Sequence, residues 1–221
     1  MQRPAALVFD LDGTLIDSRR DIATAVNRMR ADLGLPSLTL EQVVSLVGEG
    51  ARLLVRRALG GDVPEDEVDR ALAIYLEHYR RVCLDTTQPY PGVDAMLRAL
   101  ARSYPLAVLS NKGESLSRII LDGLGLTPLF REVLGGDSLP TRKPDPAGLG
   151  LLAERLDVPV EELVLIGDSW VDAETARSAG CGFVLVEWGF PRQPFPAGLE
   201  VDVRTSDAGE LTALLGNPEP P

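Results

Sequence analysis

The sequence predicts an α/β protein in which a mainly parallel sheet is interrupted near its start by an all-helical insertion. Short apolar runs alternate with amphipathic helical segments through the second half of the chain, which is typical of βαβ units with parallel strands. A similar apolar run occupies residues 5–9, but only helical patterns follow it between residues 17 and 83. We therefore assign residues 1–15 and 87–221 to a core domain and residues 16–86 to a helical domain inserted into it.

The first strand and the inserted helices are predicted from their periodicity. Residues 5–9 show no polar alternation, which favours a short strand buried on both faces. In the insertion, apolar residues recur three or four positions apart, as on one face of a helix. Thr39 with Gln42 resembles a capping box, and the acidic residues after Pro64 suit the first turn of a helix. Four helices are expected at about residues 22–33, 39–47, 52–59 and 64–82, joined as in a small bundle.

The remaining core elements follow from the same criteria, after a linker at residues 85–91. Helices are expected at residues 93–100, 116–124, 146–156 and 208–215. A further helix is expected to follow the Gly167-Asp-Ser169 loop and to end at residue 179. Strands are expected at residues 106–109, 133–134, 163–166 and 182–186, with an edge strand at 201–203. Asp145 is the expected N-cap of the third of these helices, with Pro146 at its first position. Residues 216–221 are expected to fray.

Composition and charge exclude several classes of function. The chain has 221 residues, 45% of them hydrophobic, and a formal net charge of −11. A nucleic-acid binder needs a basic surface that displaces counterions, so we expect neither nucleic acid nor an anionic membrane surface as a partner. No apolar run reaches the roughly 20 residues that span a bilayer, and no secretory signal pattern precedes the first strand. A cytoplasmic location is expected, and it agrees with Cys83 and Cys181 lying far apart without a CxxC motif.

Polar side chains directly follow three of the predicted strands. Because sites in open α/β sheets form beyond the carboxyl ends of the strands, we expect the three clusters to meet in one crevice. Residues two apart in an extended chain point to the same side, so both acids of the first cluster are able to face that crevice. The clusters are Asp10 with Asp12, Ser110 with Asn111, and Asp168 with Asp172.

Two of these clusters, and Lys143, also have a purely structural interpretation. Asp10-Leu-Asp-Gly-Thr14 is compatible with a simple turn, because Asp, Gly and Thr are common turn residues. Asp168 precedes a helix and is suited to an N-cap. Lys143, one of two lysines in the chain together with Lys112, is compatible with an ordinary surface position. The coincidence of three clusters at strand ends nevertheless favours a shared site.

The residue types in these clusters are those that phosphoryl transfer needs. Asp10 would attack phosphorus and form an aspartyl-phosphate, and Asp12 would protonate the leaving oxygen and then activate water. Neighbouring carboxylates repel one another unless a cation lies between them, and Mg²⁺ is a hard cation that prefers such oxygens. The expected Mg²⁺ ligands are Asp10, Asp12, Asp168 and Asp172, and the expected phosphate-binding residues are Thr14, Ser110, Asn111 and Lys143.

Four motifs resemble, in order, those of the haloacid dehalogenase superfamily. They are Asp10-Leu-Asp-Gly-Thr14, Ser110-Asn111, Lys143-Pro144 and Gly167-Asp-Ser-x-x-Asp172, and together they span almost the whole chain. This resemblance implies a Rossmann-like three-layer core, Mg²⁺ and an aspartyl-phosphate intermediate, and the inserted helices resemble the C1-type cap of that superfamily. Shorter matches are similar to the phosphoglycolate phosphatase group, among them Val47-Gly-Glu-Gly50 and Val186-Glu-Trp-Gly189.

The expected function is Mg²⁺-dependent hydrolysis of a small-metabolite phosphomonoester, with phosphoglycolate as the first choice of substrate. Closure of the cap would exclude water, and Glu49, Arg52 and Lys112 are the candidates for binding the far end of the substrate. A sugar-phosphate mutase or a pyrophosphatase of the same superfamily is an alternative, because the four motifs do not separate them. A phospho-acceptor signalling module uses similar residues around Mg²⁺ but needs no cap. We expect a monomer or a homodimer.

Overall fold

The core is built on a six-stranded sheet with the order β5-β4-β1-β6-β7-β8, in which neighbouring strands pair in parallel. The computed structural model describes residues 3–190, 195–199, 201 and 203–216. The strands are β1 (Ala6–Phe9), β4 (Leu106–Leu109), β5 (Glu132–Leu134), β6 (Leu163–Gly167), β7 (Gly182–Val186) and β8 (Arg204–Thr205). The predicted α/β class with a mainly parallel sheet is confirmed.

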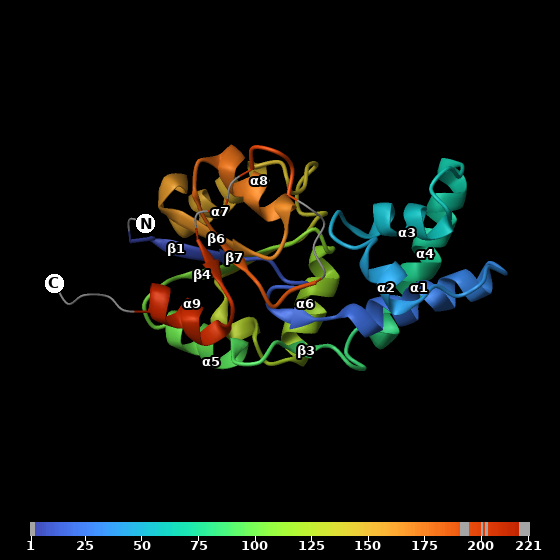
Figure 1. Cartoon of the computed structure of the whole chain (residues 1–221), viewed down its shortest axis with the longest axis horizontal. Helices are drawn as coiled ribbons and strands as arrows, with labels where there is room; N and C mark the ends of the chain where they lie inside the picture. Colours follow the sequence, from blue (N-terminus) through green and yellow to red (C-terminus); the bar gives the residue numbers. More distant parts are fainter. Residues whose placement is uncertain (1–2, 191–194, 200, 202, 217–221) are drawn as a thin grey trace.

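Helices cover both faces of this sheet, which gives three layers (Figure 1). Along β1, Leu7 and Phe9 point into a hydrophobic cluster on one face, whereas Ala6 and Val8 point into a second cluster on the other face. One face is covered by α5 (Val93–Leu100), α6 (Glu114–Gly123) and α9 (Ala208–Leu215), and the other by α7 (Ala147–Leu156) and α8 (Trp170–Ala179). Two short 3-10 helices, Thr127–Leu129 and Val160–Glu162, precede β5 and β6.

The inserted helices form a separate group at the carboxyl edge of the sheet (Figure 1). They are α1 (Arg19–Asp32), α2 (Leu40–Val44), α3 (Ala51–Leu59) and α4 (Glu65–Val82), and α4 packs against both α1 and α3. The predicted capping box of Thr39 and Gln42 is confirmed at the start of α2. We call this group the cap; the division into residues 1–15 with 87–221 and residues 16–86 stays a prediction. Among the described residues, no helix is both long and apolar enough to cross a membrane.

The two chain segments that connect core and cap pair with each other, which the sequence does not predict. Residues Ile16–Asp17 form β2 and residues Gln88–Pro89 form β3, and these two strands are antiparallel. A two-residue strand carries no readable periodicity, so the pattern indicates only a linker where β3 lies. The carboxylate of Asp21, which is 1% exposed, fixes the junction by accepting hydrogen bonds from the backbone N–H and the hydroxyl groups of Thr86 and Thr87.

Replacing Asp21 with Ala is expected to destabilise the protein by about 2–4 kcal/mol, because several buried donors lose a charged acceptor. Urea unfolding followed by circular dichroism measures this change. Asp32→Ala provides a matched control on the same helix, since Asp32 is 55% exposed and pairs with His78 at the surface; a loss of under about 1 kcal/mol is expected there. Equal losses for the two variants would contradict this account of the junction.

Two local expectations differ from the structure, and a third falls almost entirely outside the described residues. Helix α7 begins at Ala147 with Pro146 as its N-cap, one residue later than predicted, although the carboxylate of Asp145 still accepts the N–H of Ala147 at 2.9 Å. The edge strand is Arg204–Thr205 rather than 201–203, with Arg204 opposite Leu185 and Thr205 opposite Val186 of β7. The carbonyl of Val203 also accepts the N–H of Leu185, and residue 202 lies outside the described part. The expected frayed tail falls almost entirely on residues 217–221, which also lie outside it.

Candidate active site

The three polar clusters meet at the carboxyl ends of β1, β4 and β6, which are neighbours in the sheet. Asp10 follows β1, Ser110 follows β4 and Asp168 follows β6. The sheet ladder continues one residue past β1 and β4, where the N–H groups of Asp10 and Ser110 donate to the carbonyls of Ile166 and Leu134. The parallel register therefore brings these side chains to one edge, as their positions after the strands predict.

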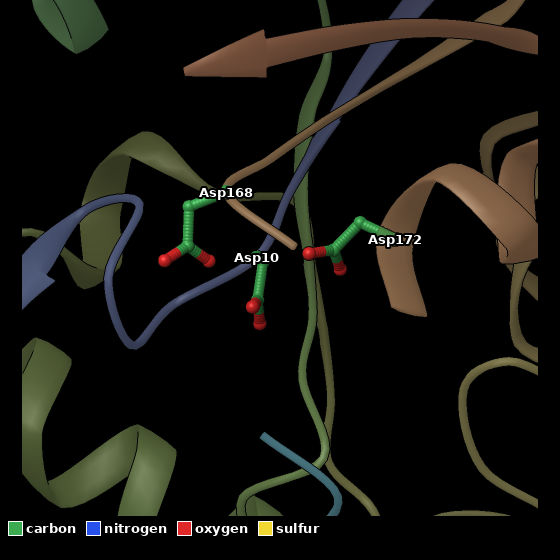
Figure 2. A group of neighbouring side chains, drawn as sticks. All are labelled: Asp10, Asp168 and Asp172. Atoms are coloured by element: carbon green, nitrogen blue, oxygen red, sulfur yellow. The ribbon is translucent and has the colours of Figure 1, made fainter. Parts of the chain in front are cut away.

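Three carboxylates lie close together at this edge (Figure 2). One oxygen from each of Asp10, Asp168 and Asp172 lies within 4.8 Å of the others. Asp168 and Asp172 are buried and the side chain of Asp10 is 13% exposed. Burial raises the pKa of Asp10 to about 6, with Asp172 adding to the shift and Lys143 opposing it. Burial and then the charges of Asp172 and Asp10 likewise hold the pKa of Asp168 well above its usual range.

Lys143 inserts its ammonium between two of these carboxylates. Its Nζ lies 2.9 Å from Asp10 Oδ1 and 2.6 Å from Asp172 Oδ1, and its side chain is 2% exposed. Burial alone would lower the pKa of Lys143, but Asp10 and Asp172 outweigh it and the net shift is upward. Lys143 therefore stays charged in the site, and its interpretation as an ordinary surface lysine is wrong.

The loop after β1 approaches the acidic cluster so closely that glycine is required. Gly13 has φ +83°, and a Cβ there would lie 2.3 Å from Asp168 Oδ2. Asp168 is held by the N–H of Phe190, which donates to Oδ2 at 2.9 Å. The N-cap of α8 is Ser169, in a capping box with Asp172, so the alternative of Asp168 as the N-cap is also wrong.

Gly13→Ala is expected to abolish most activity, because the new methyl group would push Asp168 out of the cluster. Gly34→Ala is the matched control: Gly34 has φ +71°, and a Cβ added there would meet nothing within 4 Å. Both variants carry left-handed strain of about 1–2 kcal/mol, and only Gly13→Ala adds the clash with Asp168. Steady-state hydrolysis rates separate them, and a Gly13→Ala enzyme as active as Gly34→Ala would exclude the proposed close contact.

Asp12 faces the cap rather than the acidic cluster. Its carboxylate accepts a hydrogen bond from Ser18 Oγ at 2.5 Å and from Lys112 Nζ at 2.9 Å. The same ammonium donates to the hydroxyl of Tyr79, on helix α4, at 2.6 Å. Asp12 therefore lies where the core, the connecting strand β2 and the cap come together.

The remaining predicted phosphate-binding residues lie around the cluster with part of their hydrogen-bonding capacity unused. The carbonyl of Thr14 accepts from Trp188 Nε1, while its buried Oγ1 has no partner among the described residues. Asn111 Nδ2 donates to the carbonyls of Lys143 and Gly48, and the latter bond crosses from core to cap. The buried Oδ1 of Asn111 likewise has no partner within the described part of the chain. Such orphaned buried groups are typical of a site that binds a polar ligand.

A cleft with about 1100 Å³ of open space, part of it continuous with solvent, separates the core site from the cap. Of the three predicted specificity residues, Lys112 and Glu49 line it and Arg52 does not. Glu49 pairs with Arg57 at 2.5 Å. Arg52 pairs with Glu65 and Asp69 on α4. Apolar and aromatic side chains of core and cap also line the cleft, among them Ile22, Leu54, Tyr75, Leu76, Leu116 and Phe190.

Sequence reasoning misses two side chains that contact the candidate site. The periodicity places Tyr79 on the packing face of a helix, and it does pack there, but its hydroxyl reaches Lys112. Ser18 stands outside the three polar clusters in the sequence, yet it hydrogen-bonds Asp12. The available signal for Tyr79 is the spacing of Tyr75 and Tyr79, which places two phenols one helical turn apart. Periodicity alone does not tell such a phenol from a packing residue.

The acidic cluster fits a divalent cation. Its donors are carboxylate oxygens, which suit a hard divalent ion. Three carboxylates face a single ammonium. Burial is the main cause of the raised pKa of Asp10 and of Asp168, and repulsion from the neighbouring carboxylates adds to both shifts. A cation bound between the three would relieve that repulsion.

Fold and site together define a class of enzyme. The sequence profile of the haloacid dehalogenase-like hydrolases matches residues 7–186, and the chain belongs to this family. Phosphoglycolate phosphatase of Rhodospirillum rubrum is 39% identical over 225 residues, covering 98% of this chain and 93% of that protein. Phosphoglycolate phosphatase of Nitrosospira multiformis is 37% identical over 215 residues, with 95% of each chain covered.

The fold agrees with that relationship. The crystal structure of a predicted phosphoglycolate phosphatase from Haemophilus somnus superposes with a TM-score of 0.89 at 32% identity. The match covers 97% of this chain and 99% of that one. Core and cap are therefore shared over essentially the whole length.

Proposed function

We propose that the protein is a Mg²⁺-dependent phosphatase that hydrolyses a small phosphomonoester, best represented by phosphoglycolate, through an aspartyl-phosphate on Asp10. The observation that carries this proposal is the meeting of Asp10, Lys143, Asp168 and Asp172 at one edge of the sheet, facing a cleft closed by the cap. The curated relatives that share this chain over nearly its full length carry the name phosphoglycolate phosphatase.

In the first half of the reaction, Asp10 attacks phosphorus and the substrate oxygen leaves. Lys143 neutralises charge beside the nucleophile, since its ammonium lies 2.9 Å from Asp10. The hydroxyl of Ser110 accepts the N–H of Lys112 at 3.3 Å, which leaves its O–H to donate to a phosphoryl oxygen. Thr14 Oγ1 and the side chain of Asn111 are the further polar groups proposed at the phosphate.

Asp12 carries the proton in both halves of the reaction. It donates a proton to the leaving oxygen, which becomes the alcohol, and its carboxylate then takes a proton from the water that attacks the aspartyl-phosphate. Phosphate is released and Asp10 is regenerated. The proposed Mg²⁺ site consists of the carboxylates of Asp10 and Asp168, the backbone carbonyl of Asp12 and, in support, Asp172. Mg²⁺ bound there supplies the positive charge that neutralises the phosphoryl oxygens as charge develops on them.

Lys112 and Glu49 are the proposed contacts for the far end of the substrate, because both line the cleft. The ammonium of Lys112 suits the carboxylate of phosphoglycolate, because it has three N–H donors and its bonds to Asp12 and Tyr79 occupy two of them. The proposal for Arg52 is weakened, since Arg52 does not line the cleft and its guanidinium pairs with Glu65 and Asp69 on α4. The cytoplasmic location and the monomeric or homodimeric state stay predictions.

A panel of phosphate esters tests this proposal. The purified protein is expected to release phosphate from phosphoglycolate in Mg²⁺, to stop when EDTA is added and to recover when Mg²⁺ is restored. A sugar-phosphate mutase would instead return an isomerised product, a pyrophosphatase would prefer pyrophosphate, and a phospho-acceptor module would take up one phosphoryl group and stall. Full activity in excess EDTA would contradict the metal-dependent mechanism.

A further inference from the structure

The ammonium of Lys112 touches one functional group on each side of the junction between core and cap. It donates to the carboxylate of Asp12 at 2.9 Å and to the hydroxyl of Tyr79 at 2.6 Å. It also lies 4.5 Å from the centre of the Tyr79 ring, within cation–π range. The side chains of Lys112 and Asp12 are 7% and 14% exposed, so the bridge is largely shielded from solvent.

We infer that Tyr79 and Lys112 are positioning residues for Asp12, and that the cap thereby supplies part of the machinery for proton transfer. Tyr79 fixes the ammonium, and the ammonium together with Ser18 fixes the direction of the Asp12 carboxyl group. The inference rests on the proposed function, in which Asp12 protonates the leaving oxygen.

The physical basis is the precision that proton transfer demands. A general acid acts within hydrogen-bond reach, about 3 Å, of the atom that it protonates. A lysine side chain has four rotatable bonds and retains about 2 kcal/mol of rotamer freedom unless its ammonium is held. A Lys112 with no second partner would leave Asp12 free to rotate, whereas the phenol of Tyr79 restricts the ammonium from the opposite side.

Tyr79 is itself held in a defined orientation. Its ring stacks on Tyr75 with centroids 5.6 Å apart and an interplanar angle of 13°. A second bond across the same junction, from Asn111 Nδ2 to the carbonyl of Gly48, comes from the same core loop as Lys112. The position of Asp12 is therefore coupled to the position of the cap, and the site is complete only when the cap lies against the core.

Tyr79→Phe tests this inference, because it removes the hydroxyl acceptor and keeps the ring. The readout is kcat/KM for two substrates without a carboxylate, n-propyl phosphate and para-nitrophenyl phosphate. For each substrate, kcat/KM reports the steps up to departure of the leaving group, so hydrolysis of the aspartyl-phosphate does not affect it. A propoxide leaving group needs a proton from Asp12, whereas nitrophenolate leaves without one. Tyr79→Phe is expected to lower kcat/KM for propyl phosphate about tenfold or more, with a much smaller change for the aryl ester.

Tyr75→Phe is the matched control, since it removes a phenol hydroxyl one turn away that does not bond Lys112. This variant is expected to retain the wild-type ratio of kcat/KM for propyl phosphate to kcat/KM for the aryl ester. Lys112→Met is expected to reproduce the selective loss on propyl phosphate. Equal losses on both esters, or no loss for Tyr79→Phe, would overturn the inference while leaving the proposed function standing. Failure of the proposed function is recognised separately, by an Asp10→Asn enzyme that remains active.

Discussion

Asp10→Asn is expected to reduce hydrolysis by about four orders of magnitude or more while leaving the fold intact. An amide of the same shape is not a nucleophile, and removal of a catalytic nucleophile commonly costs this much. Stability is not expected to fall, because the substitution removes one charge from a repelling cluster and Lys143 keeps its contact with Asp172 at 2.6 Å. Steady-state kinetics and thermal unfolding, measured on the same preparation, check both parts of this expectation.

Asp94→Asn is a suitable control for Asp10→Asn. Asp94 is an exposed carboxylate on α5 that pairs with Arg98 at 2.9 Å and does not line the cleft. It is expected to retain wild-type rates. An Asp10→Asn enzyme with full activity would remove Asp10 as the nucleophile and with it the aspartyl-phosphate.

Lys143→Met is expected to destabilise the metal-free protein by about 3–5 kcal/mol, because it leaves buried carboxylates without their counter-charge. Asp172, which is fully buried, is the partner most affected. Urea unfolding in EDTA measures the loss. Activity is expected to fall as well, since the charge beside Asp10 disappears.

A double variant separates the lost ion pair from a general packing defect. Adding Asp172→Asn to Lys143→Met removes the stranded charge, so part of the lost stability is expected to return. Two additive losses, or a single-variant loss under about 1 kcal/mol, would show that the buried pair does not stabilise the site as described.

The sequence predicts the part of this structure that depends on local pattern and on sheet topology. Asp10, Ser110 and Asp168 are identifiable because each follows a purely apolar run, and parallel strands bring such positions to one edge. Lys143 is identifiable as a rare lysine in a proline-rich loop and by the motif to which it belongs. Its burial between two carboxylates follows from the tertiary fold.

Features at the boundary between core and cap are not predictable in this way. The bond between Lys112 and Tyr79, the bond between Asn111 and Gly48, and the pairing of β2 with β3 all join segments far apart in sequence. Each depends on how the cap is placed against the core, and the local hydrophobic periodicity does not indicate that placement. Arg52 shows that nearness in sequence does not imply nearness to the site. It lies close to the Gly48-Glu-Gly50 loop in sequence, yet its side chain pairs with α4 and does not line the cleft.

The central claim is that Asp10 itself receives the phosphoryl group, and trapping that group tests the claim most directly. The enzyme is mixed with phosphoglycolate and Mg²⁺, quenched in acid within the first turnovers, digested and examined by mass spectrometry. The account predicts one added phosphoryl group on the peptide that contains Asp10 and Asp12, at Asp10, and none in the Asp10→Asn variant. Rapid turnover with no phosphorylated peptide, or with the group on another residue, would contradict it.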